Sequence, residues 1–156
     1  MNKRRYKALF FDLDGTLLPM DMEVFLKNYF KTLAGFAAEK GYEAQSFSEA
    51  LGKATRAMVT TSGGVNADRF WSVFMQCMDG TRDEYETFIT EFYEGPFNNL
   101  SLAVTPNPAA AEIIDTLKAK GYPLYLTTMP LFPRIAVENR LKWAGCNPAN
   151  FDRITT

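Results

Sequence analysis

The chain has 156 residues, of which 47% are hydrophobic and 14% aromatic, so it can bury a packed core and differs from a disordered chain. Its formal net charge of −1 gives no electrostatic reason to bind nucleic acids, and no nucleic-acid partner is expected. The sequence contains no histidine, which excludes Ser-His-Asp and Cys-His catalysis and histidine-rich zinc sites. Acid–base chemistry must therefore come from carboxylates, Lys, Tyr or Cys.

The first predicted element is a short strand that leads directly into two acidic residues. Residues 8–11 are four consecutive apolar residues followed by a turn signal, a pattern typical of a strand buried on both faces. Asp12 and Asp14 come directly after this strand, and Gly15 and Thr16 make the turn. At the carboxyl end of such a strand, the two carboxylates would face the crevice in which open α/β sheets bind ligands.

A helical segment follows, from residue 20 to about residue 95. Apolar residues recur there at helical spacing in four stretches with short loops between them, which predicts a small helical bundle. Each stretch begins at a residue or motif typical of a helix N-terminus, and these are, in order, Asp21, Ser46, Asn66 and Thr81. Gly95 and Pro96 end the last helix of the segment.

Strands and helices alternate in the remaining sequence. Asn107-Pro108 begins a helix, and residues 123–128 are typical of a second strand. Pro133 begins another helix, and residues 151–156 are typical of a third strand. Because helices separate the strands, we expect right-handed crossovers and a parallel sheet.

The expected fold class is therefore α/β, a Rossmann-like parallel sheet interrupted after its first strand by an all-α insertion. Residues 1–19 and 97–156 are predicted to form the α/β core domain, and residues 20–96 the helical domain. No apolar run reaches membrane-spanning length, and the N-terminus lacks the apolar region and cleavage site of a signal peptide. We expect a cytoplasmic protein without membrane contact.

Asp12 and Asp14 allow three interpretations. They could simply initiate and cap a turn, they could bind a cation, or one could be a nucleophile and the other a general acid–base residue. Two acids next to a buried strand repel each other unless a cation or another partner offsets their charge. Mg²⁺ would do this with carboxylate and carbonyl oxygens, and a carboxylate beside it could attack phosphorus to form an aspartyl-phosphate.

Thr127 and Thr128 lie at the matching end of the second predicted strand. Threonine is common in strands, so a purely structural role is a strong alternative for both residues. Successive strand residues alternate between faces, but at the strand end either hydroxyl could turn into the crevice. A hydroxyl and a backbone N–H at this point would hold a phosphate oxygen.

These residues carry a resemblance to a known family. The segment from Phe10 to Leu18, with its Asp-x-Asp-Gly-Thr pattern after an apolar strand, resembles the first motif of the haloacid-dehalogenase-like (HAD) hydrolases. Residues 124–128 are similar to the second motif, an apolar strand that ends in Thr or Ser. Residues 20–95 resemble the helical cap that one class of the family carries between these motifs, so the resemblance spans nearly the whole chain.

The resemblance implies roles for particular residues. It implies that Asp12 is the nucleophile and Asp14 the general acid–base residue, with Mg²⁺ bound by the Asp12 carboxylate and the Asp14 carbonyl. It also implies that Thr128 and the backbone N–H of Met129 bind the phosphate, although the family often has Asn where Met129 stands. Dehalogenases of the family lack the second acid, so Asp14 favours phosphoryl transfer on a small phosphorylated metabolite.

The family's third and fourth motifs are not expected within this sequence. The third supplies a Lys or Arg after the third strand, and the fourth supplies acids that complete the Mg²⁺ site after the next strand. The sequence stops at Thr156, inside the third predicted strand, and the basic residues before it lie too early for the third motif: Arg134, Arg140, Lys142 and Arg153. We therefore expect a truncated phosphatase with an incomplete metal site and little or no activity.

Two other functions remain open. Without a partner strand on its far side, the first strand would present an unpaired apolar edge that invites self-association. The chain could then be a non-catalytic binding or assembly module, or half of a split enzyme. A phosphotransferase similar to a sugar phosphomutase, which would use Asp12 in the same way, is a weaker alternative.

Overall fold

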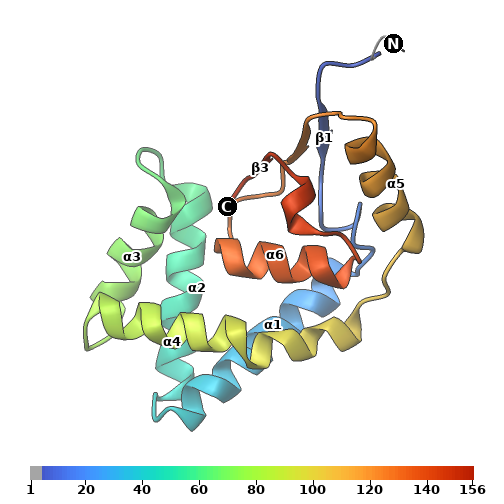
Figure 1. The fold of residues 1–156 in the computed structure, drawn as a ribbon. Helices are drawn as coiled ribbons and strands as arrows, with labels where there is room; N and C mark the ends of the chain where they lie inside the picture. Colours follow the sequence, from blue (N-terminus) through green and yellow to red (C-terminus); the bar gives the residue numbers. More distant parts are fainter. Residues whose placement is uncertain (1–4) are drawn as a thin grey trace. The chain divides into compact units, whose positions relative to one another are not determined.

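The computed structural model describes residues 5–156, and Figure 1 shows their course. Contacts within the chain divide it into two compact units. The α/β unit comprises the residues up to Phe25 together with Leu100–Thr156, and the helical unit comprises Leu26–Asn99. Helix α1 (Met22–Glu39) starts in the α/β unit and continues through the helical unit, and the domain boundaries predicted from the sequence stay a prediction.

The α/β unit is built on a parallel sheet, as the alternation of strands and helices predicts. Its strands are β1 (Leu9–Phe11), β2 (Leu124–Leu126) and β3 (Arg153–Ile154), in the spatial order β1-β2-β3. Phe11 pairs with Leu126, and Leu126 pairs with Ile154, so the three strands end at the same level. The strands are shorter than predicted. After β2 the chain turns within a few residues, where Leu131 N donates to Met129 O (2.8 Å).

Both crossover helices of the α/β unit cover the same face of the sheet. Helix α5 (Pro108–Ala119) precedes β2, and helix α6 (Arg134–Trp143) connects β2 to β3. The two connections step across the sheet in the same direction, and residues of both helices belong to one core cluster, as expected of right-handed crossovers. The aliphatic core of the unit lies between this face and the helices and includes Leu13, Leu17, Leu18, Ile114, Leu124, Leu126, Val137, Leu141 and Ile154.

The opposite face of the sheet is uncovered among the described residues. Phe10, whose side chain points away from the core, is 67% exposed and stacks on the half-buried ring of Tyr125 with 5.0 Å between ring centroids. Arg153 pairs with Tyr125 in register and is also exposed. The prediction that the first strand is buried on both faces is therefore wrong, because no helix of residues 5–156 packs over Phe10.

The helical unit contains most of α1, followed by α2 (Ala44–Thr60), α3 (Asn66–Cys77) and α4 (Arg82–Glu94). Its interior is aromatic; the rings buried there belong to Tyr29, Phe47, Phe74, Tyr85, Phe88, Phe92, Tyr93 and Phe97. The helices predicted from apolar spacing in this part of the chain are confirmed. A 3₁₀ helix, η1 (Pro96–Ala103), follows α4 where the sequence predicts only a stop.

The helix starts of this unit follow the sequence only in part. Thr81 forms the predicted capping box with Glu84 at the start of α4. Helix α2 starts earlier than predicted, because the Glu43 carboxylate accepts hydrogen bonds from the N–H groups of Gln45 and Ser46. Asn66 does not cap α3, since Val65 occupies that position without a side-chain cap.

We also considered whether any helix could cross a membrane. None of the helices within residues 5–156 combines the length and the apolar character that crossing a membrane requires.

Candidate active site

The aligned ends of the three strands bring their following residues to one edge of the sheet. Thr127 N donates to the carbonyl of Phe11 (2.7 Å), and Thr155 N donates to the carbonyl of Leu126 (3.0 Å). Asp12 therefore starts its turn at the level of Thr127, which is the arrangement that the sequence predicts for the ends of the first two strands. Open α/β sheets place ligands at this edge.

A compact turn fixes the positions of the two acidic residues that follow β1. The carbonyl of Leu13 accepts hydrogen bonds from the N–H groups of Leu18 (2.9 Å) and Thr16 (3.2 Å). Gly15 makes the reversal possible with a φ of +80°, a conformation that other residues rarely adopt. Leu13 and Leu18 are fully buried, so the turn is anchored in the core.

Asp12 is an exposed carboxylate on this turn. Its Oδ2 accepts a hydrogen bond from the hydroxyl of Thr16 (3.1 Å). Thr16 lies four residues later in the same turn. The Asp12 side chain is thus oriented but accessible, as a nucleophile or a metal ligand at a sheet edge must be.

Asp14 lies in a different environment, two residues later. Its side chain is only 13% exposed, and its Oδ2 accepts a hydrogen bond from Nη1 of Arg140 at 2.5 Å. Arg140 is fully buried, its guanidinium lies 4.3 Å from the ring centroid of Phe132, and its Nε donates to the carbonyl of Ala136 (3.3 Å). The buried carboxylate is thus paired with a buried cation from α6.

Arg140 is the residue of this site that the sequence did not predict. The one available signal is its position on α6, where the buried residues Ala136, Val137, Leu141 and Ala144 form a stripe at helical spacing. Arg140 falls within this stripe, four residues after Ala136. A charged residue on the buried face of a helix needs a counter-charge, and the only way to identify Asp14 as that counter-charge is to know the fold.

Burial raises the pKa of Asp14, whereas the positive charge and hydrogen bond of Arg140 lower it. The neighbouring negative charge of Asp12 raises the pKa further, and the Thr128 side chain favours the ionised form. No hydrogen bond of ordinary geometry reaches the buried Oδ1 of Asp14 within residues 5–156. The net direction is upward, so Asp14 holds a proton more readily than an exposed aspartate does.

The predicted phosphate ligands lie beside these acids with different exposure. Thr128 is 5% exposed and close to Asp14, and its carbonyl accepts a hydrogen bond from the Thr155 hydroxyl (2.6 Å). Met129 follows it and is 64% exposed. The Thr127 hydroxyl donates to the carbonyl of Phe11 (3.3 Å), so it ties β2 to β1. Phosphate binding by Thr128 and Met129 stays a prediction.

Comparison with known proteins identifies the family. The model of the haloacid dehalogenase-like hydrolases matches residues 6–145, which is most of the chain. The chain belongs to the haloacid dehalogenase-like hydrolases. None of the proteins with curated descriptions matches it.

Two solved structures of bacterial proteins are similar to this HAD chain. One is a predicted phosphoglycolate phosphatase from Haemophilus somnus 129PT, with 22% sequence identity, a TM-score of 0.41 and 99% of this chain covered. The other is a putative phosphoglycolate phosphatase from Lactobacillus delbrueckii subsp. bulgaricus, with 19% identity, a TM-score of 0.42 and 97% covered. The chain spans 64% of the first protein and 65% of the second.

The oxygen atoms of this HAD site suit a magnesium ion. Mg²⁺ commonly binds one or two carboxylates and completes its coordination with water and substrate phosphate, so the accessible Asp12 carboxylate and the Asp14 carbonyl are appropriate donors. Residues 5–156 contain no cluster of three or more acidic or thiol side chains that could hold a metal alone. Arg140 also weakens the charge argument for a metal, because it already offsets the charge of Asp14.

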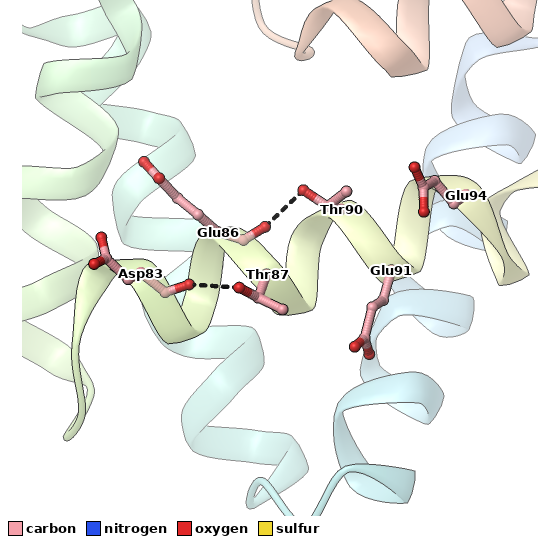
Figure 2. A pocket seen from close by; sticks show the side chains of 6 residues that line it. All are labelled: Asp83, Glu86, Thr87, Thr90, Glu91 and Glu94. Atoms are coloured by element: carbon pink, nitrogen blue, oxygen red, sulfur yellow. Dashed lines mark hydrogen bonds between the residues drawn. The ribbon is translucent and has the colours of Figure 1, made fainter.

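A shallow hollow of about 500 Å³ elsewhere in the molecule does not form part of this site. Figure 2 shows its lining, which comes entirely from α4 and consists of Asp83, Glu86, Thr87, Thr90, Glu91 and Glu94. Its two hydroxyl groups bond to backbone carbonyls one turn earlier on the same helix, at 2.8 and 2.9 Å. We interpret the hollow as the solvated acidic face of α4.

Proposed function

We propose that this chain carries the nucleophile and the acid–base residue of a Mg²⁺-dependent phosphatase that acts on a small phosphorylated metabolite. The observation that carries the proposal is the contrast between the two acids of one turn. Asp12 is exposed and accessible, whereas Asp14 is largely buried and paired with Arg140. Membership of a hydrolase family supports the same reaction class.

The proposed reaction has two steps, both centred on these acids. In the first, an Asp12 oxygen attacks phosphorus, the bond to the leaving oxygen breaks, and Asp14 gives its proton to that oxygen. In the second, Asp14 takes a proton from water, the water oxygen attacks phosphorus, and Asp12 is released together with inorganic phosphate. A bound Mg²⁺ would offset the negative charge of the phosphate and of Asp12.

The differing environments of the two acids support this division of roles. A general acid must hold a proton near neutral pH, and burial of Asp14 shifts its pKa in that direction. A nucleophile must be ionised and accessible, and Asp12 is exposed. The Thr128 hydroxyl and the Met129 N–H would hold a phosphate oxygen beside them, at the end of β2.

The test is hydrolysis of p-nitrophenyl phosphate at high protein concentration, with Mg²⁺ or with EDTA. We expect slow release of p-nitrophenol that requires Mg²⁺, because few metal ligands come from residues 5–156. Asp12→Asn is expected to lower the rate by at least ~10³-fold. Asp68→Asn makes the same chemical change on the exposed surface of α3 and should leave the rate unchanged.

A covalent readout accompanies the rate. Acid-quenched protein should gain the mass of one phosphoryl group, and Asp12→Asn should remove this species. Turnover that persists in Asp12→Asn would contradict the proposal. A phosphotransferase would give the same trapped species, but its turnover would depend on the concentration of an added sugar or sugar-phosphate acceptor.

A second candidate function, a non-catalytic assembly module, is favoured by the exposed face of the sheet. β1 lies at an edge of the described sheet, and Phe10 is 67% exposed on it. Strand edges with apolar side chains pair readily with other chains. Size-exclusion chromatography with light scattering distinguishes the two candidates, since a stable monomer at micromolar concentration argues against assembly through this edge.

A further inference from the structure

We propose that Arg140 is a positioning residue of this site: it acts through Asp14, whose carboxylate it holds in one orientation on the turn behind β1. This inference rests on the proposed phosphatase function and extends it to a residue of α6. Arg140 is 126 positions away from Asp14 in the sequence, so the pairing is a product of the fold.

The guanidinium of Arg140 is itself held from several sides. Its Nε donates to the carbonyl of Ala136 (3.3 Å), one turn earlier on α6. Its central carbon lies 4.3 Å from the ring centroid of Phe132 and 6.0 Å from that of Phe25. A planar guanidinium that is stacked and hydrogen-bonded has little rotational freedom, so its hydrogen bond to Asp14 fixes the orientation of the carboxylate as well.

Asp14 receives this bond on a backbone that is already fixed. The turn from Leu13 to Leu18 is closed by hydrogen bonds at both ends, which leaves side-chain rotation as the main freedom of Asp14. Arg140 removes that freedom through Oδ2, at 2.5 Å. The other oxygen, Oδ1, makes no ordinary hydrogen bond within residues 5–156 and is the oxygen left to take part in proton exchange.

Stability alone is a poor explanation for this pair. Buried ion pairs are often no more stabilising than apolar side chains of similar size, because both charges lose their hydration. Oδ1 is a buried oxygen that lacks a hydrogen bond of ordinary geometry within residues 5–156, and such an atom also calls for an explanation. Arg140 is fully buried, so it does not contact a substrate directly, and its effect must pass through Asp14.

The test compares two substrates that differ in their need for a general acid. The p-nitrophenolate ion leaves without protonation, whereas the alkoxide of β-glycerophosphate must be protonated as it leaves. We measure kcat/KM for both substrates, because this ratio reports the step that breaks the bond to the leaving oxygen. Thermal unfolding and circular dichroism establish the folded fraction of each variant.

We expect Arg140→Met to lower kcat/KM by about 10²-fold for β-glycerophosphate and by less than about 10-fold for p-nitrophenyl phosphate. Arg140→Lys should restore part of the loss on β-glycerophosphate, because it returns a positive charge to Asp14. Arg134→Gln, on the exposed side of the same helix, should change neither value. If Arg140→Met does not fold, Arg140→Lys takes its place in the test. A larger loss of kcat/KM on β-glycerophosphate than on p-nitrophenyl phosphate in that variant would support the inference.

Equal losses on the two substrates would overturn the inference, because a merely structural role lowers all activity in parallel. That result would leave the proposed function intact. Absence of both turnover and the trapped phosphoryl species in the unaltered protein would instead overturn the proposed function, and the inference with it.

Discussion

The α/β unit buries one of its ion pairs, whereas the ion pairs among the described residues of the helical unit are all exposed. In the α/β unit, the Arg140–Asp14 pair lies inside, at the end of the strands, with Arg140 fully buried. In the helical unit, the ion pairs lie at the surface, as in Lys40–Glu91, whose side chains are 44% and 47% exposed. Burying charge is costly, so the buried pair at the expected active-site edge supports the roles proposed for Asp14 and Arg140.

The two interiors differ as well. The core of the α/β unit is mainly aliphatic, whereas the helical unit packs ring against ring. Phe47, for example, lies 5.7 Å from Phe74 and 5.2 Å from Phe88, measured between ring centroids. The chain contains two tryptophans, Trp71 on α3 and Trp143 on α6, so single-tryptophan variants report on each unit separately.

The largest loss of stability is expected in the aromatic interior. Phe47 is 1% exposed, and replacing it by alanine leaves a large cavity among rings. We expect Phe47→Ala to lower the free energy of unfolding by about 3–5 kcal/mol. Urea unfolding followed by Trp71 fluorescence measures this loss. If the unfolding midpoint reported by Trp143 falls to the same urea concentration as that reported by Trp71, the two units unfold together. In that case they do not differ in stability.

The next loss concerns the buried pair of the α/β unit. Arg140→Met should cost about 3 kcal/mol, because it leaves the Asp14 carboxylate largely buried without its counter-charge. Adding Asp14→Asn removes the uncompensated charge, so the double variant should recover at least half of that loss. Urea unfolding of the two single variants and the double variant, followed by Trp143, gives the coupling energy. Additive losses would show that the two side chains do not interact.

A smaller loss is expected at the start of α4. Thr81 Oγ1 accepts a hydrogen bond from Glu84 N, and the Glu84 carboxylate accepts one from Thr81 N, so the two residues cap the helix reciprocally. Thr81→Ala should cost about 1 kcal/mol. Trp71 is a suitable probe because Arg82, the first residue of α4, lies over its ring at 5.4 Å. No change at Trp71 would contradict the expected contribution of this cap.

The smallest effect is expected for an exposed pair on the same helix as Arg140. Arg134 and Glu138 are 2.6 Å apart, nearly the same separation as in the buried pair, but the Arg134 side chain is 55% exposed. Arg134→Gln should therefore change the free energy of unfolding by less than ~0.5 kcal/mol. A loss comparable to that of Arg140→Met would show that burial is not what separates the two pairs.

The elements of the fold and the position of the two acids could be predicted from sequence, because their signals are local. An apolar strand followed by Asp12 and Asp14, and apolar spacing in the helices, depend on residues a few positions apart. Helix starts were less predictable where a residue earlier in the chain offers an alternative cap. Glu43 caps α2 three residues ahead of Ser46, and its carboxylate accepts hydrogen bonds from the N–H groups of Gln45 and Ser46.

Two features depended on distant residues and could not be predicted. Arg140 pairs with Asp14 only because α6 packs beside the turn after β1. Phe10 is exposed because α5 and α6 cover the same face of the sheet, which the strand's own sequence does not show. Both features belong to the arrangement of elements rather than to the elements themselves.

The one-sided sheet also determines which substitutions the chain tolerates. Along β1, Leu9 and Phe11 pack against the core, whereas the residue between them, Phe10, does not. A polar residue should therefore be accepted at position 10 and rejected on either side of it, so tolerance should alternate with the two-residue period of a strand. A complete substitution scan of β1, scored by protein abundance, would show which face of the sheet is exposed to solvent in the folded chain.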